Sequence, residues 1–542
     1  MRSGARAAIA GALFAAMIGT AGCGGGQDDA SDGANAGGDD KSSLKSAKTG
    51  PPSAAEVRTT AKEFLAAWSS GSAAKAAALT DDTKTATTAL TGYRTKAHID
   101  KVALEPGQPS GRTVPFSVSA RISYGGRQVP WTYESSLTVT RDTRSGKAVV
   151  DWKPSVVHPK LHTGDTLSTG ESEAPPIKAV DRDGGALTAA GHPTLKTVLE
   201  GLRERYGKKA GGTAGVETWI ARAKGAKSPD ETLKVLSKGT PGTLRTTIDP
   251  KLQRTAEQAV SKRSKAAVVA VKPSTGEILA VANSPADSFN AALQGSYAPG
   301  STMKVITSAT LLDKGLAGYG KQHPCPKYSS YGGWKFQNDD KFEIKHGTFE
   351  QSFARSCNTA FISQAPKLKD DDLTKEARDV FGIGLNWQAG APSFDGAVPV
   401  QSGASKAASL IGQGGVRMNP LNMASVSATA STGVFRQPYL VAPSVDDRTL
   451  AKATRTMKSS TRDQLRKLMH LTATSGTAAE AMSGMSGDFG AKTGSAEVDG
   501  QKKPNGWFTA YRGDLAAAGV VPEGGHGGDT AGPIVASLLR AG

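Results

Sequence analysis

Three short motifs of polar residues stand far apart in the second half of the chain and leave few folds open to it. They are Ser301-x-x-Lys304, Ser356-x-Asn358 and Lys492-Thr493-Gly494, in that order. Each motif combines a hydroxyl with an amine or amide side chain, the groups that activated-serine chemistry uses. They can act on one substrate only if the chain brings them into one cleft, so the residues between them must form its scaffold.

The first motif predicts a nucleophile and its base. The residues after Lys304 continue with helical spacing, which places Ser301 near a helix N-terminus and on the same face as Lys304. A serine hydroxyl needs a base, and a lysine amine can serve if its pKa falls from ~10.4 to near neutrality. Burial and a second cation both lower that pKa. The helix N-terminus adds partial positive charge and offers the Ser301 N–H to an oxyanion.

A single Ser-x-x-Lys tetrad is weak support for this chemistry. The same spacing occurs at Ser42 to Lys45 and at Ser72 to Lys75, and residues 48–50 imitate the third motif. None of these copies has an apolar scaffold or the complete order of motifs around it. The specificity of the signal therefore rests on the full set.

The length and composition of the chain predict several domains. A chain of 542 residues is too long for one core, and its apolar share of 38% suffices for globular cores. Composition and patterning divide it into a signal peptide at 1–22, a flexible tether at 23–52, an α+β domain at 53–155, a short linker or pedestal at 156–245 and a larger domain at 246–542.

The N-terminus has the form of a secretory signal. Arg2 and Arg6 precede an apolar run at 7–22, which is shorter than the ~20 residues that a membrane-spanning helix needs. Small residues then precede Cys23, an arrangement similar to a bacterial lipobox, in which Cys23 would be acylated. Ordinary signal cleavage with an incidental Cys23 is the alternative. The tether has no aromatic residue and too little apolar surface to offset the entropy of ordering it.

The segment at 53–155 predicts one helix packed on an antiparallel sheet. Apolar residues at helical intervals run from Val57 to Trp68, with Ser53 as the N-cap. Alternating apolar residues predict strands at 116–122, 131–139 and 149–152.

The remaining elements surround the three motifs. A helix is predicted at 195–206, another begins after Asp249, and residues 266–282 read as a β-hairpin. Strands around Lys492, Trp507 and Leu515 would join this hairpin in one antiparallel sheet, with a final helix at 532–539 on its face. Helices carrying Ser301 and Ser356 would form the other side of the cleft.

The ordered motifs Ser-x-x-Lys, Ser-x-Asn and Lys-Thr-Gly mark the penicillin-binding and β-lactamase superfamily. The chain resembles a class B, monofunctional penicillin-binding protein over 156–542. Its other matches to that family are Asp181-Arg182-Asp183-Gly184, Ile411-Gly412-Gln413-Gly414, Asn419-Pro420-Leu421 and Ser475-Gly476-Thr477-Ala478. Residues 53–155 resemble the nuclear-transport-factor-like cone found before some of these enzymes. The implied fold is multidomain α+β, a transpeptidase domain with an antiparallel sheet flanked by helices, preceded by an α+β cone domain.

The resemblance implies a role for each motif residue. Ser301 would form an acyl-enzyme with a D-alanyl-D-alanine stem peptide, and Lys304 would take its proton. Ser356 would relay a proton to the leaving group, while Asn358 would hold Lys304 and the substrate amide. The substrate side would use Lys492 for positive potential, Thr493 for the terminal carboxylate, Gly494 for close backbone approach and the Ser495 N–H for the oxyanion.

The implied function is a peptidoglycan D,D-transpeptidase that β-lactams inhibit covalently, without metal or organic cofactor. It would sit on the extracytoplasmic face of the membrane, held by a lipid anchor, with cell-wall synthesis proteins as further partners. The net charge of +17 favours acidic wall polymers or anionic lipids, and nucleic acid is not expected outside the membrane.

Three alternatives share these features. A D,D-carboxypeptidase differs only in letting water attack the acyl-enzyme, and a β-lactamase adds a group that activates that water. A β-lactam-sensing or wall-binding lipoprotein would keep the domain without its turnover. Cys325 and Cys357 leave two alternatives open. An extracytoplasmic site permits a disulfide between them, and the other interpretation is that Cys357 is a buried thiol beside the cleft.

Overall fold

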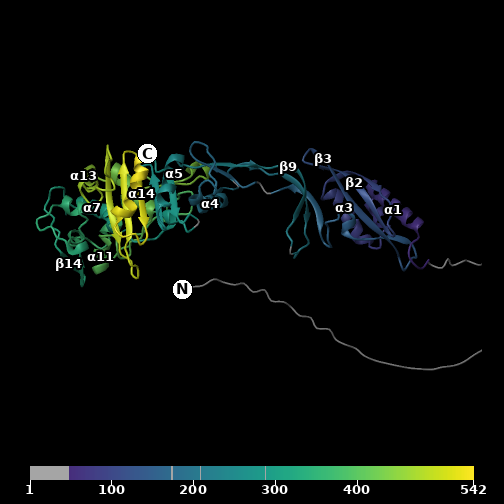
Figure 1. Ribbon diagram of the computed structural model, residues 1–542, viewed down its shortest axis with the longest axis horizontal. Coiled ribbons are helices and arrows are strands. Elements are labelled where there is room, and N and C mark those ends of the chain that lie inside the picture. Colours follow the sequence, from purple (N-terminus) through teal and green to yellow (C-terminus); the bar gives the residue numbers. More distant parts are fainter. Residues whose placement is uncertain (1–47, 173–174, 208, 227, 287) are drawn as a thin grey trace, which may run out of the picture.

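The structure of the chain is a computed structural model that describes residues 48–542 except 173–174, 208, 227 and 287 (Figure 1). The predicted signal peptide at 1–22, Cys23 and nearly all of the tether at 23–52 lie outside the described residues. Across the described ranges, no helix is both long enough and apolar enough to cross a membrane.

The N-terminal domain packs three helices on a four-stranded antiparallel sheet of order β1-β2-β3-β4. Its elements are α1 (Ala54–Ser69), α2 (Ala73–Ala77), α3 (Thr83–Thr95), β1 (Ile99–Pro106), β2 (Thr113–Tyr124), β3 (Arg127–Arg141) and β4 (Ala148–Asp151). As predicted, α1 begins at Ser53, whose hydroxyl accepts from the Glu56 N–H while the Glu56 carboxylate accepts from the Ser53 N–H.

The sequence prediction for this domain missed two helices and one strand. The residues of α3 are mostly polar, and only Ala86, Leu90 and Tyr93 are buried, so its helical period is faint. Strand β1 buries Ile99 alone and shows no alternation of large apolar residues. Trp152 was predicted inside a strand, but it follows the end of β4. Its side chain is buried, and its ring centroid lies 6.3 Å from that of Phe64.

Residues between the two large domains pack partly on each of them. The elements are β5 (Thr166–Glu171), β6 (Lys178–Val180), η2 (Pro193–Leu195), α4 (Lys196–Tyr206), β7 (Gly212–Thr213), β8 (Val216–Ala221), β9 (Glu231–Ser237), β10 (Thr240–Pro241) and β11 (Thr243–Arg245). Leu167 of β5 and Ile220 of β8 belong to the core of the N-terminal domain. Leu199 and Leu202 of α4, the predicted helix, belong to the core of the C-terminal domain instead.

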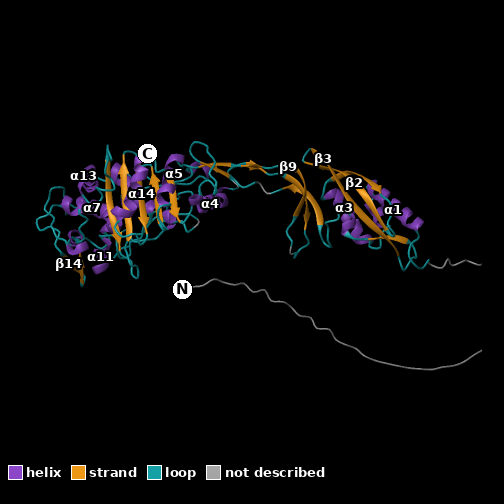
Figure 2. Cartoon of the chain, viewed as in Figure 1, coloured by secondary structure: helices purple, strands orange, loops and turns teal. Residues whose placement is uncertain are grey.

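A five-stranded antiparallel sheet of order β13-β12-β18-β17-β16 forms the centre of the C-terminal domain (Figure 2). Its strands are β12 (Ala266–Val271), β13 (Ile278–Ser284), β16 (Phe489–Ala496), β17 (Asn505–Arg512) and β18 (Leu515–Val521). This confirms that the hairpin at 266–282 joins the strands around Lys492, Trp507 and Leu515. Strand β16, which carries the third motif, lies at the edge of the sheet.

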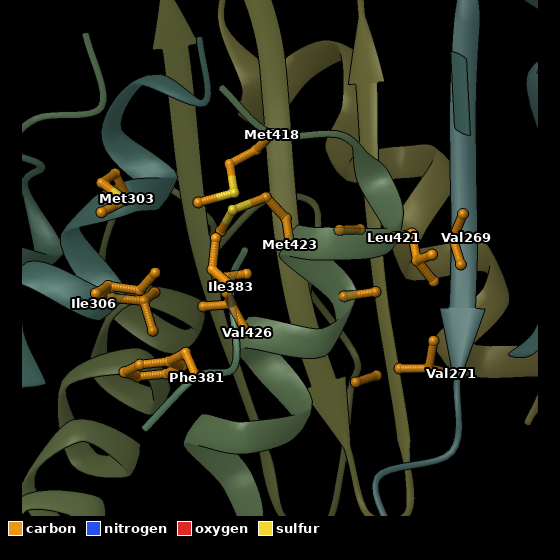
Figure 3. Close-up of a cluster of buried hydrophobic side chains, with 14 of the residues drawn as sticks. Val269, Val271, Met303, Ile306, Phe381, Ile383, Met418, Leu421, Met423 and Val426 are labelled. Carbon is orange, nitrogen blue, oxygen red and sulfur yellow. The ribbon is translucent and has the colours of Figure 1, made fainter. Parts of the chain in front are cut away.

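Helices cover both faces of this sheet. Helix α5 (Pro250–Val260) and helix α14 (Gly527–Ala541), which is longer than the predicted 532–539, share one core with Val268. Helix α12 (Pro420–Thr432) packs on the opposite face with Val269. Figure 3 shows Leu421 and Val426 of α12 between Val269 and the side chains of Met303 and Ile306. The side chains of β12 thus alternate between the two cores, as in a strand buried on both faces.

The remaining helices and strands of the C-terminal domain lie between β13 and β16 in the chain. They are α6 (Ala291–Gln294), η3 (Gly300–Met303), α7 (Lys304–Asp313), β14 (Tyr328–Tyr331), β15 (Trp334–Gln337), η4 (Asp339–Lys341), α8 (Phe349–Ala354), α9 (Thr359–Ile362), η5 (Ala365–Lys367), α10 (Asp372–Asp379), α11 (Gly403–Ser409), η6 (Pro443–Val445) and α13 (Ser459–Ser475).

Candidate active site

Ser301 lies in the 3₁₀ turn η3, directly before α7, so it is near a helix N-terminus as the sequence predicts. Backbone contacts fix this turn. The Gly300 N–H donates to the Gly412 carbonyl at 3.0 Å, and Gly300 has a φ of +53°. A Cβ on Gly300 would stand 2.5 Å from the Ser495 carbonyl oxygen, and one on Gly412 would stand 2.0 Å from the Gly300 oxygen. Side chains are therefore excluded where the turn meets its two neighbours.

Lys304 is fully buried, and its amine meets three oxygens. Its Nζ lies 2.8 Å from Ser301 Oγ, 2.7 Å from the Ser356 carbonyl oxygen and 2.8 Å from Asn358 Oδ1. The first and second motifs, separated by more than fifty residues of chain, thus meet at one nitrogen atom.

Ser356 does not lie within a helix, contrary to the expectation from sequence. It occupies the junction between α8 and α9 with a φ of +58°, a conformation that a helix interior does not allow. This conformation turns its carbonyl toward Lys304. Its hydroxyl accepts a hydrogen bond from Lys492 Nζ at 2.9 Å and lies 3.5 Å from Lys304 Nζ. The Ser356 hydroxyl therefore bridges the two buried amines.

Burial lowers the pKa values of both amines. For Lys304 the pKa lies well below its usual range, first because of burial and then because of the charge of Lys492. Burial lowers the pKa of Lys492 to about 7. The exposed carboxylate of Asp339 acts in the opposite direction and raises both pKa values. An uncharged Lys304 amine at neutral pH is the physical requirement for a proton acceptor beside Ser301.

The third motif lies along the edge strand β16, against the turn of Ser301. A Cβ on Gly494 would stand 3.0 Å from the Pro299 oxygen and 3.1 Å from the Thr302 nitrogen, which explains the need for a small residue there. Thr493 is buried to all but 7% of its surface, and Ser495 pairs with Gly506 on β17.

Thr477 lies beside Thr493 in the same region. The two hydroxyl oxygens are 2.6 Å apart, and Thr477 itself is exposed in the turn after α13. No role for Thr477 follows from the sequence, because its motif at 475–478 matches the family without indicating a contact. Its position next to Thr493 places a second hydroxyl at the site predicted for a carboxylate.

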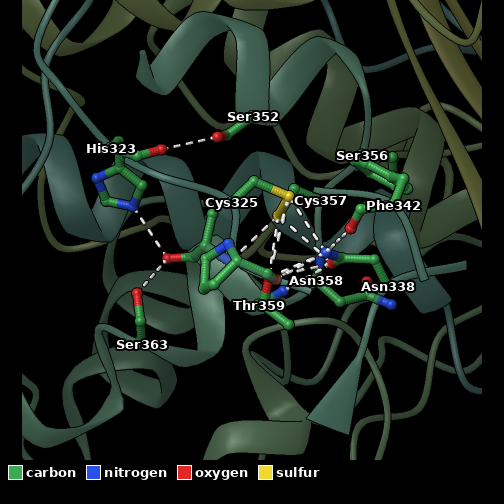
Figure 4. Close-up of a disulfide and its surroundings, with 12 residues drawn as sticks. His323, Cys325, Asn338, Phe342, Ser352, Ser356, Cys357, Asn358, Thr359 and Ser363 are labelled. Carbon is green, nitrogen blue, oxygen red and sulfur yellow. Dashed lines mark hydrogen bonds between the residues drawn. A yellow bond between two sulfur atoms is a disulfide. The ribbon is translucent and has the colours of Figure 1, made fainter. Parts of the chain in front are cut away.

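Cys325 and Cys357 form a disulfide, which settles the alternative in favour of the bridge over the free thiol (Figure 4). Cys357 is the middle residue of the second motif, so the disulfide ties that motif to the loop that follows α7. Within the described part of the chain, no group of three or more His, Cys, Asp or Glu side chains is arranged to hold a metal ion.

Comparisons with known proteins give two family matches. Residues 266–540 match the family model described as the penicillin-binding protein transpeptidase domain, and residues 56–165 match an NTF2-like N-terminal transpeptidase domain. A peptidoglycan D,D-transpeptidase PbpA of Mycolicibacterium smegmatis is 29% identical over 368 residues, which is 56% of this chain and 73% of that protein. Stage V sporulation protein D of Bacillus subtilis is 26% identical over 396 residues, which is 63% of this chain and 60% of that protein.

Solved structures share the fold. Pseudomonas aeruginosa PBP2, solved with WCK 5153, has a TM-score of 0.55 at 21% identity, covering 68% of this chain and 96% of that one. Penicillin-binding protein 3 of Mycobacterium tuberculosis also has a TM-score of 0.55, at 19% identity, covering 69% and 96%. The predicted fold class, a transpeptidase domain behind an NTF2-like α+β domain, is confirmed.

Proposed function

This chain belongs to the penicillin-binding protein transpeptidase family, and we propose that it cross-links peptidoglycan stem peptides through an acyl-enzyme on Ser301. The curated relatives that it matches include peptidoglycan D,D-transpeptidases. The same acyl-enzyme chemistry makes β-lactams covalent inhibitors of the protein. Within this reaction, we propose a role for each site residue, supported by the contacts described above.

One observation carries the assignment of the base. A neutral lysine amine has two N–H groups and one lone pair, and Lys304 Nζ has three oxygens within 2.8 Å, with the Ser356 hydroxyl farther away at 3.5 Å. Two of these, the Ser356 carbonyl and Asn358 Oδ1, can only accept, so they take the two N–H groups. The lone pair then faces Ser301 Oγ, whose O–H can only donate to it. The arrangement fits a base that removes the proton of Ser301.

Acylation begins with the attack of Ser301 and ends with the release of the terminal D-alanine. Ser301 Oγ bonds to the carbonyl carbon of the penultimate D-alanine as its proton passes to Lys304. The backbone N–H groups of Ser301 and Ser495 stabilise the oxyanion. The C–N bond then breaks, and the terminal D-alanine leaves with a proton relayed through the Ser356 hydroxyl. The amine of a second stem peptide then attacks the ester carbonyl, the C–O bond to Ser301 breaks, and the proton that the amine loses returns to Ser301 Oγ.

The substrate binds along β16. Thr493 and the positive potential of Lys492 take the terminal carboxylate, because an edge strand with a buried cation behind it suits an extended anionic peptide. Gly494 leaves room for that peptide's backbone. The contacts that keep Gly494 close to η3 support the placement of the Ser495 N–H beside Ser301.

The protein acts on the extracytoplasmic side of the membrane, in wall synthesis, as other penicillin-binding proteins do. We propose further that Cys23 carries a lipid anchor after removal of residues 1–22, and that 23–52 is a tether. Residues 53–155 then form the cone, 156–245 the pedestal and 246–542 the transpeptidase domain. Cell-wall synthesis proteins are proposed partners.

A fluorescent penicillin tests the assignment. The wild-type chain is expected to form one covalent adduct that decays slowly, and Ser301→Ala to form none. An adduct that persists in Ser301→Ala would overturn the nucleophile, and rapid decay would indicate a lactamase. Incubation with a D-Ala-D-Ala peptide and an acceptor amine separates the remaining alternative, because a carboxypeptidase releases D-alanine without forming the cross-linked product.

A further inference from the structure

Asn338 is a buried side chain with four backbone hydrogen-bond partners, two of which lie at the end of the middle motif and directly after it. Only 1% of its surface is exposed. Its Nδ2 donates to the carbonyls of Pro326 at 3.0 Å and Phe342 at 2.9 Å. Its Oδ1 accepts from the backbone N–H groups of Asn358 at 2.8 Å and Thr359 at 3.0 Å. Figure 4 shows these contacts beside the disulfide.

These bonds join three segments: the residues after Cys325, the turn at 338–342 and the start of α9. A planar amide supplies two donors and an acceptor at once, which no other side chain of this size does. An aspartate would leave the Phe342 carbonyl without a donor and would remove one of the two donors to the Pro326 carbonyl, which also accepts from the Thr359 hydroxyl. A buried polar group without its partner costs about 1–3 kcal/mol.

The same backbone carries the acceptors of the catalytic amine. Asn358, whose N–H is held by Asn338, presents Oδ1 to Lys304 at 2.8 Å. Two residues earlier, the Ser356 carbonyl accepts from Lys304 at 2.7 Å. Cys357 stands between them and is bonded to Cys325, next to the Pro326 carbonyl that Asn338 also holds. A non-covalent and a covalent tie thus fix the same short stretch of backbone.

We propose that Asn338 is a positioning residue for acylation, which together with the Cys325–Cys357 disulfide holds Ser356 and Asn358 where they direct the Lys304 lone pair at Ser301. The proposal rests on the transpeptidase function above. A displacement of about 1 Å at a reacting centre costs up to about a hundredfold in rate, so losing this support slows acylation without removing any reacting group.

The test uses the full chain and compares Asn338→Asp with Asn419→Asp. Asn419 is a matched control, because it is also fully buried, accepts from the Asn422 N–H and donates to the Leu293 and Phe394 carbonyls, but contacts none of the motif residues. Both variants are expected to lower the thermal midpoint. Only Asn338→Asp is expected to lower the acylation rate constant at saturating penicillin, by about ten- to a hundredfold.

The non-covalent dissociation constant for penicillin is expected to stay at its wild-type value in Asn338→Ser, because no contact joins Asn338 to Thr493 or Lys492 and serine, unlike aspartate, adds no charge near the two lysines. Replacement of both cysteines by alanine is expected to lower the same rate constant, and to lower it further when combined with Asn338→Ser. If Asn338→Asp does not fold, the acylation rate constants of Asn338→Ser and of the double cysteine-to-alanine variant are compared with that of the control instead.

An Asn338→Asp or Asn338→Ser chain that is acylated at the rate of Asn419→Asp would overturn the proposal. So would a change confined to the penicillin dissociation constant. Failure of the wild-type chain to label at Ser301 would overturn the proposed function instead, so the two failures are distinguishable.

Discussion

Two lysines share one buried cluster at the site, and a single exposed carboxylate acts on both. Asp339 raises the pKa values of Lys304 and Lys492, whereas burial lowers them. Asp339→Asn removes the opposing charge, so both pKa values are expected to fall further. In the proposed mechanism acylation needs the uncharged Lys304 amine, so the acid limb of the acylation rate against pH is expected to move to lower pH.

The measurement is the second-order acylation rate between pH 4 and pH 9. Asp340→Asn is the control, because Asp340 is the exposed neighbour of Asp339 and does not perturb either lysine. An acid limb that stays at its wild-type position in Asp339→Asn would contradict this account of the charge on the base.

Thr477 places a hydroxyl 2.6 Å from that of Thr493. Thr477→Val keeps the shape of the side chain and removes the hydroxyl, so the dissociation constant of a carboxylate-bearing β-lactam is expected to rise about fivefold or more, the equivalent of one hydrogen bond. The acylation rate constant at saturation is expected to remain unchanged. In the control, Thr474→Val, the lost hydroxyl bonds only to backbone carbonyls of its own helix. Equal dissociation constants for the two variants would contradict a role for Thr477.

Sequence reasoning finds residues whose chemistry is rare and whose spacing is fixed. Ser301, Lys304 and the other motif residues fit this description, so they were predicted. Asn338 could not be predicted, because a lone asparagine in a loop has no period in the sequence and its backbone partners lie up to 21 residues away. The motif at 475–478 was recognised, but nothing in it indicates that Thr477 contacts Thr493.

At the scale of elements, the predicted ones were those with a strong apolar period and a clear cap, such as α1, α5 and the strands of the central sheet. Strand β12 is apolar on both faces and was recognised by its length and its turn. Elements that bury few residues, such as α3, were missed because so few apolar positions do not produce a recognisable helical period in the sequence. The left-handed Ser356 was missed because non-glycine residues give no local signal for it.

The turn of Ser301 is held by packing of one backbone against another. Gly412→Ala is expected to displace it, because the new Cβ would stand 2.0 Å from the Gly300 oxygen and Gly412 has a φ of +76°. Acylation is expected to fall by about a hundredfold. Gly384→Ala is the control, because Gly384 has the same φ of +76° but its nearest atom is 3.7 Å away. Equal acylation rates in the two variants would contradict this role of the contact.

The whole molecule contains buried clusters that do not merge. Leu90 belongs to the core of the N-terminal domain, while Leu202, outside the matched range of 266–540, belongs to that of the C-terminal domain. Each leucine is fully buried, so replacement by alanine is expected to cost about 2–5 kcal/mol. Calorimetry is expected to show two transitions, with Leu90→Ala lowering one and Leu202→Ala the other.

Bound penicillin identifies the transitions, because a ligand raises the midpoint only of the unit that binds it. It is expected to raise the transition that Leu202→Ala lowers. A single shared transition, lowered equally by both variants, would show that the two domains unfold as one.

Main-chain atoms pack closely against one another at Gly300, Gly412 and Gly494. This packing limits which substitutions the protein can accept under antibiotic selection. Replacement of any of the three brings a new carbon to within about 3 Å of main-chain atoms that cannot swing aside. Escape from a drug through these positions would disable the enzyme together with its inhibitor. Heritable resistance in this chain is therefore expected to accumulate around the rim of the site, where exposed side chains such as Thr477 can vary while the turn that carries Ser301 stays as it is.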